Sequence, residues 1–137
     1  MPETLLAFDY GTRRIGIAVG QTLTGTARPL ATLKSRNGKP DWEAIGRLIR
    51  EWQPDRLVVG LPLHMDGSEQ PMTELARRFG RQLEGRYNLP VEWADERLTS
   101  EEAERNLPGG GDKAAIDAEA AAVILQGWLD RQAGQTI

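Results

Sequence analysis

The chain of 137 residues contains no cysteine, no long apolar run and only one histidine, His64. The lack of cysteine excludes disulfides and thiolate metal sites and favours a reducing cytoplasm. The apolar runs are too short to cross a bilayer, and the N-terminal sequence MPETLLAFDYG lacks the order of a signal peptide. We therefore expect a cytoplasmic protein with no membrane partner.

An excess of basic charge is also missing. The net charge is −3 and the pI is about 5.2, which argues against strong nonspecific affinity for nucleic acid. The charge is uneven, because residues 1–52 hold 8 Lys or Arg and 5 Asp or Glu, whereas the rest hold 9 and 15. Such a chain could bind a polyanion locally, or the asymmetry could be surface variation without function.

The length suits one domain over residues 1–137. Apolar segments at 5–10 and 15–21 predict two strands joined by a short turn, and residues 27–35 predict a third. A helix over 40–52, a buried strand over 56–63 and a helix over 72–83 follow, the last ended by Gly85 or by residues 88–90. A strand at 91–95, a helix start near Thr99 or Ser100 and a helix over 114–130 complete the order.

This order predicts an α/β fold. A three-strand antiparallel meander is followed by parallel strands, which gives a five-stranded mixed sheet with helices on both faces. The four tryptophans fall mostly on apolar faces and are expected in the core rather than as platforms for bases. They are Trp42, Trp52, Trp93 and Trp128.

Acidic residues stand at the ends of predicted elements. Asp9 ends the first strand, Asp95 and Glu96 end the last strand, and Asp117 lies in the first turns of the final helix. Sites in open sheets gather at strand ends, so acids that are distant in sequence can meet there. Carboxylates repel one another, and their usual reason to cluster is a hard cation such as Mg²⁺ or Mn²⁺. Each acid alone could instead be a turn, strand-end or helix-start residue.

Two such cations can activate water and stabilise a leaving oxygen, which is the chemistry of phosphodiester hydrolysis. The pattern does not distinguish Asp95 from Glu96, because adjacent strand residues face opposite sides of the sheet.

Four blocks, FDYGTRRIGIAVG, VVGLPLHMDGSEQP, DERLTSEEAE and IDAEAAAVILQ, resemble in this order the YqgF family of RNase H-like proteins. The family comprises pre-16S ribosomal RNA nucleases that have also been proposed as Holliday junction resolvases. The resemblance covers nearly the whole chain and implies an RNase H-like fold. It implies that Asp9, Glu96 and Asp117 are the catalytic acids that bind Mg²⁺ or Mn²⁺, and so selects Glu96 over Asp95. His64 stands where the family more often has Asn.

Several other residues are candidates for contacts with a nucleic acid. Arg13 and Arg14 lie in the turn after Asp9, where guanidinium groups can hold phosphates, although exposed turn arginines are also common. Lys113 could contact a phosphate or could simply be solvated. His64 is expected to have a loop or surface role.

Gly11 and Gly16 allow positive φ or a close backbone approach, where a substrate phosphate could also come near.

The leading hypothesis is a metal-dependent nuclease that trims the 5′ end of pre-16S ribosomal RNA, free or within a ribosomal particle. A Holliday junction resolvase would use the same acids on branched DNA, and symmetric cutting would need a homodimer rather than a monomer. The DYGT stretch also resembles the phosphate loop of sugar kinases and actin, although their cleft needs two domains. An RNA-binding assembly factor without cleavage is the non-enzyme alternative, which the acidic net charge disfavours.

Overall fold

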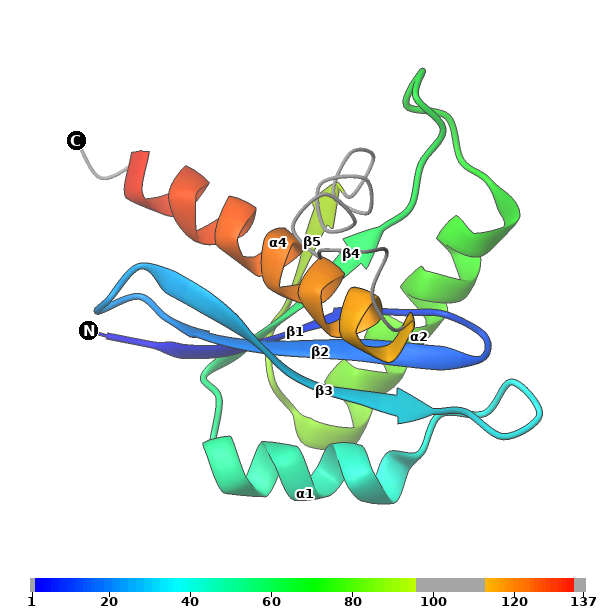
Figure 1. Ribbon diagram of the computed structural model, residues 1–137, viewed down its shortest axis with the longest axis horizontal. Helices are drawn as coiled ribbons and strands as arrows, with labels where there is room; N and C mark the ends of the chain where they lie inside the picture. The colour runs from blue at the N-terminus through cyan, green and yellow to red at the C-terminus, as the bar shows by residue number, and fades with distance from the viewer. Residues whose placement is uncertain (1, 96–112, 135–137) are drawn as a thin grey trace.

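The computed structural model describes residues 2–95 and 113–134 (Figure 1). Its sheet has the strand order β3-β2-β1-β4-β5. The pairs β1–β2 and β2–β3 are antiparallel, whereas β1–β4 and β4–β5 are parallel, which confirms the predicted meander and mixed sheet. The strands are β1 (Thr4–Asp9), β2 (Arg14–Gln21), β3 (Thr26–Lys34), β4 (Arg56–Leu61) and β5 (Val91–Asp95).

Three helices are described: α1 (Trp42–Trp52), α2 (Pro71–Tyr87) and α4 (Lys113–Gly134). The Asp41 carboxylate accepts a hydrogen bond from the Ala44 N–H at 3.1 Å and so caps the start of α1. Helix α2 ends at Asn88, which adopts the left-handed conformation with φ 54°. Of the two predicted ends, the one at residues 88–90 is confirmed, and Gly85 lies inside the helix. The helix start predicted near Thr99 lies outside the described residues.

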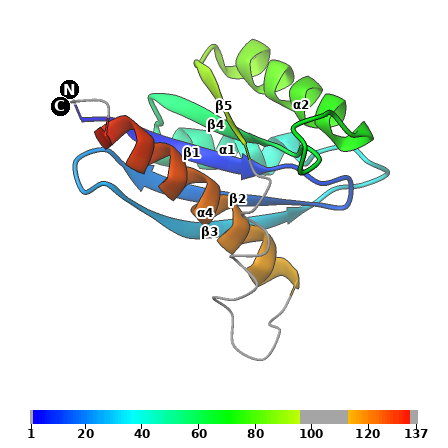
Figure 2. The ribbon, with the colours of Figure 1, turned by 90° about the horizontal axis from the view of Figure 1, so that it is seen from above.

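The helices cover both faces of the sheet, as predicted. Helix α4 lies across one face, and α1 and α2 lie on the other (Figure 2). Alternate residues of β1 serve the two cores: Leu5 and Ala7 join the α4 side, whereas Leu6 and Phe8 join the α1 and α2 side. Both cores are therefore built on the central strand that ends at Asp9.

Small residues on β2 let α4 approach the sheet closely. Ala18 lies in the α4 core with Gly16 and Gly20 two residues to either side, and α4 contributes buried alanines at 118, 120, 121 and 122. A Cβ at Gly20 would lie 2.9 Å from Leu125 Cδ2. The position of α4 along β2 is therefore set by contacts that a larger side chain would prevent.

The tryptophans lie largely where the apolar pattern predicts. Trp128 is buried under α4, and Trp42 and Trp52 pack at the edge of the other core. Trp93 is the exception at 39% exposed, and its ring covers Gly80 of α2, where a Cβ would meet the ring at 2.3 Å. Among the described residues, no helix is long and apolar enough to span a membrane.

Candidate active site at the carboxyl end of strand β1

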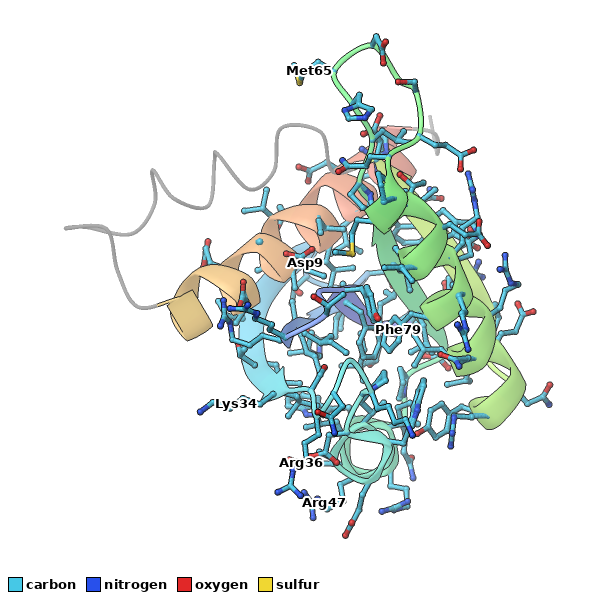
Figure 3. All side chains as sticks on the ribbon, turned by 90° about the vertical axis from the view of Figure 1, so that its right-hand side faces the viewer. Asp9, Lys34, Arg36, Arg47, Met65 and Phe79 are labelled. Carbon is cyan, nitrogen blue, oxygen red and sulfur yellow. The ribbon has the colours of Figure 1, made fainter. Side chains whose placement is uncertain are left out.

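Asp9 is the last residue of β1 and lies on the α4 face of the sheet. It follows Ala7, which is buried beneath α4, and alternation directs both side chains to the same face. Its side chain is half-buried, and Figure 3 shows it beside the α4 ribbon. A carboxylate in this place stands at the rim of an apolar core, where it remains accessible to ligands.

Gly16 brings the second predicted acid to Asp9. The antiparallel register pairs Asp9 with Gly16 across β1 and β2. A Cβ at Gly16 would lie only 1.9 Å from the backbone oxygen of Asp117, so the first part of α4 rests directly on this glycine. The missing side chain therefore places Asp117 next to Asp9, although 108 positions separate the two in sequence.

Arg14 fixes the Asp117 side chain. Its Nε donates a hydrogen bond to Asp117 Oδ2 at 2.6 Å, and the two side chains are 31% and 26% exposed. Charge-assisted bonds of this kind are stronger than neutral ones. Arg14 thus lies at the predicted site, but its partner in this structure is a site carboxylate.

Asp95 lies on the opposite face of the sheet from Asp9. Its neighbour Ala94 belongs to the core under α4, so alternation turns Asp95 toward the α2 side, where Trp93 also packs. The register agrees, since Asp95 pairs with Leu61, two residues beyond Val59 of the α2-side core. The geometry thus separates Asp95 from the two acids. Glu96 lies outside the described residues.

The donor set at this rim suits a hard divalent cation. Asp9 and Asp117 offer carboxylate oxygens, and Glu96 is the predicted third acid. Within the described part of the chain, no group of three or more His, Cys, Asp or Glu is arranged to hold a metal ion. Only two of the three predicted ligands belong to that part.

The remaining predicted residues lie around the same edge. Arg13 is exposed in the β1–β2 turn, and its carbonyl accepts a hydrogen bond from the Ser35 N–H at 2.9 Å. Lys113 is the first residue of α4. Of the two alternatives for Gly11 and Gly16, the close backbone approach is confirmed at both, since a Cβ would lie 2.6 Å from the Arg14 carbonyl oxygen at Gly11 and 1.9 Å from that of Asp117 at Gly16. Neither glycine has positive φ.

His64 belongs to an ordered loop that follows β4. Its N–H donates to the Ser68 carbonyl at 2.9 Å, and Asp66 accepts hydrogen bonds from the Ser68 N–H at 2.8 Å and hydroxyl at 2.6 Å. These bonds from Ser68 hold the pKa of the Asp66 carboxyl below its usual value. His64 therefore has the expected exposed loop position.

Sequence reasoning missed a tight hairpin that follows β3. Arg36 and Lys39 exchange backbone hydrogen bonds of 3.0 and 2.8 Å around Asn37 and Gly38, whose φ values are 52° and 74°. Two positive φ values mark a type I′ turn, for which Asn-Gly is the strongest short signal, so the dipeptide could have revealed it. Lys34 and Arg36 lie on the edge viewed in Figure 3, and they add positive charge there.

The sequence matches a family model described as "RuvX: Holliday junction resolvase" over residues 3–131. A protein of Edwardsiella ictaluri is 52% identical over 136 residues, which cover 96% of this chain and 97% of that protein. A protein of Paraburkholderia phymatum is 59% identical over 128 residues, covering 93% and 85%. Both carry the name "Putative pre-16S rRNA nuclease".

Solved structures share the fold at low sequence identity. RuvC of Thermus thermophilus in complex with a Holliday junction substrate aligns with a TM-score of 0.54 and 16% identity, covering 96% of each chain. The Fowlpox virus resolvase in complex with Holliday junction DNA aligns with a TM-score of 0.57 and 12% identity, covering 94% of this chain and 98% of that one. These similarities confirm the RNase H-like fold.

Proposed function

We propose that this chain, which belongs to the RuvX (YqgF) family of Holliday junction resolvases, is a metal-dependent nuclease whose substrate is the 5′ region of pre-16S ribosomal RNA. The observation that carries the proposal is the contact of Asp117 with Gly16, the residue opposite Asp9. This contact brings together two carboxylates from the ends of the chain, beside the end of a central strand.

Asp9, Glu96 and Asp117 would hold the cation, either Mg²⁺ or Mn²⁺. When bound there, divalent cations supply an activated water and neutralise charge on the scissile phosphate. Asp9 is half-buried against the core, so its carboxylate keeps a defined position. The α4 backbone at Asp117 is held by Gly16 and its side chain by Arg14, which together orient the second carboxylate.

Cationic side chains nearby would position the phosphodiester backbone. Arg13 is exposed in the turn that follows Asp9, and Lys113 begins the helix that carries Asp117. Arg14 is already at the site and would contact phosphate once Asp117 has another partner. Phosphate contacts of this kind position a substrate and do not select its sequence.

The names of the relatives support RNA as the substrate. The protein would act in the cytoplasm as a monomer or homodimer. A Holliday junction resolvase is the second candidate, supported by the family description. It would need two copies of the site for symmetric cutting, so a strict monomer on a sizing column would count against it.

The test compares a 5′-extended small-subunit ribosomal RNA precursor with a four-way DNA junction. Each is incubated with Mg²⁺, Mn²⁺ or EDTA and with wild type, Asp9→Asn or the control Glu43→Gln, an exposed acid on α1. We expect metal-dependent cutting of the RNA that Asp9→Asn abolishes and Glu43→Gln retains. Cutting of the junction alone would assign the resolvase function. Metal-dependent cutting that survives in Asp9→Asn would refute the site.

A further inference from the structure

A hollow with a volume of about 490 Å³ opens on the α1 and α2 side of the sheet. Its volume lies in the roughly 300–1,000 Å³ range of small-molecule sites. We call it the aromatic hollow. Its lining includes Tyr10, Lys39, Trp42, Arg78, Phe79 and Arg86.

The charge of the aromatic hollow is of one sign. Lys39, Arg78 and Arg86 contribute three cations, and none of the residues that line it is acidic. Among the described residues, none of these three cations forms an ion pair with a carboxylate. A neighbouring hollow over residues 34–43 differs, because Asp41 and Glu43 line it beside its basic residues. The aromatic hollow therefore favours an anionic ligand.

Its wall consists of aromatic rings already held in place. Phe79 is buried, and its ring centroid lies 5.0 Å from that of Tyr10 and 5.6 Å from that of Trp42. The Arg86 guanidinium lies 4.1 Å from the Trp42 ring centroid, a cation–π contact that leaves its charge unneutralised. A ligand with a phosphate and a flat ring would meet matching groups here.

The aromatic hollow and the candidate active site are linked by two consecutive residues of the chain. Tyr10 follows Asp9 directly, and alternation turns Tyr10 toward Phe79 while Asp9 faces α4. Consecutive Cα atoms are about 3.8 Å apart. The candidate site and the hollow therefore face consecutive residues at the end of β1, on opposite faces of the sheet.

We propose that the aromatic hollow binds a nucleotide of the nucleic-acid substrate on one side of the cleaved bond. Lys39, Arg78 and Arg86 hold its phosphate, and the exposed parts of Tyr10 and Trp42 contact its sugar and base. This inference rests on the proposed function, since it assigns the hollow to the same substrate. It implies that the substrate strand extends from the α4 side to the α2 side of the sheet.

The test measures binding without cleavage. A fluorescein-labelled single-stranded RNA is titrated in EDTA at several salt concentrations with wild type and with the double variant Lys39→Gln/Arg78→Gln. We expect a loss of affinity of about tenfold or more. The slope of log K against log salt should fall by about 1.4, because each phosphate contact on a single strand contributes roughly 0.7.

A matched control removes the same charge elsewhere. Arg47→Gln/Arg81→Gln replaces two exposed arginines that pair with Glu43 and Glu74 outside the aromatic hollow. The Trp42 indole N–H resonance should shift on addition of RNA to wild type and to this control, but not in the hollow variant. Equal losses of affinity in both double variants, or no shift of Trp42 in wild type, would overturn the inference.

Cleavage is assayed separately, so the two proposals can fail independently. If wild type cleaves with metal and the hollow variant binds RNA as wild type does, the nuclease function stands and nucleotide binding by the hollow is rejected. Reduced binding by the hollow variant, with no cleavage by wild type under any metal condition, rejects the nuclease and retains the nucleotide-binding hollow.

Discussion

Gly16 and Asp117 are in such close contact that a Cβ on the glycine would lie 1.9 Å from the Asp117 carbonyl oxygen. The atoms that would clash belong to helix backbone, which cannot move aside as the end of a flexible side chain can. Because Gly16 is also the register partner of Asp9, this contact places the α4 backbone at Asp117 next to the end of β1. The packing of α4 on β2 and the assembly of the site thus depend on the same residue.

We predict that Gly16→Ala destabilises the protein and separates the two acids. Overpacking of a core typically costs about 1–3 kcal/mol, and a contact this short should reach or exceed the upper end. Gly85→Ala is the control, because Gly85 lies in α2 with open space around it and alanine favours the helix by about 1 kcal/mol. In urea unfolding, the free energy of unfolding should therefore fall in Gly16→Ala and rise in Gly85→Ala. A neutral effect of Gly16→Ala would contradict the described packing of α4.

The sequence predicts the strands and their order well because each strand carries a clear period or a buried run. It also predicts which acids end these elements. The sequence pattern alone does not predict which of Asp95 and Glu96 faces the site, because that depends on the register of the strand. The structure turns Asp95 toward α2, whereas Glu96, which the family resemblance selects, lies outside the described residues.

The aromatic hollow could not be predicted from local pattern. Trp42 and Phe79 occupy apolar positions of two amphipathic helices, so their periodicity indicates core in both cases. Lys39, Arg78 and Arg86 come from a hairpin tip and from α2, and only the tertiary fold brings them together. The Arg14–Asp117 pair likewise joins residues 103 positions apart.

Asp9→Asn is expected to abolish cleavage while the protein remains folded. The amide keeps the size of the side chain but removes the anionic oxygen that a divalent cation requires. Loss of a residue that only orients a metal ligand lowers metal affinity or activity by roughly 10–100-fold. Loss of a ligand itself should lower the cleavage rate by more than this. Single-turnover cleavage with saturating Mg²⁺ or Mn²⁺ measures the effect, and circular dichroism confirms folding. A folded variant that retains most of its activity would remove Asp9 from the catalytic set.

The loop after β4 should be sensitive to acid through Asp66. Hydrogen bonds from Ser68 lower the pKa of Asp66 in the folded state, so they stabilise the loop above the unfolded pKa of about 3.9. This stabilisation is lost as the pH falls through the lower, folded pKa. An NMR titration should give a pKa of Asp66 below about 3.9 in wild type and a pKa closer to that value in Ser68→Ala. Equal values in the two proteins would exclude Ser68 as the cause.

Arg14→Gln is expected to change metal binding and cleavage in opposite directions. In the structure, Arg14 Nε lies 2.6 Å from Asp117 Oδ2, so the guanidinium competes with any cation for this carboxylate. Without that competitor, Mn²⁺ should bind more tightly to the free protein, as measured by calorimetry. Cleavage should nevertheless slow, because a cation that can hold phosphate beside the site has been removed.

Arg14→Lys separates these two roles. Lysine keeps the positive charge but lacks the planar fork, so it should compete less well for Asp117 and still attract phosphate. We expect Mn²⁺ affinity between those of wild type and Arg14→Gln, and cleavage closer to wild type. If Arg14 serves only to hold α4 in place, both variants would lower the free energy of unfolding and weaken Mn²⁺ binding together. Tighter Mn²⁺ binding with slower cleavage in Arg14→Gln would instead show that Arg14 acts at the site itself.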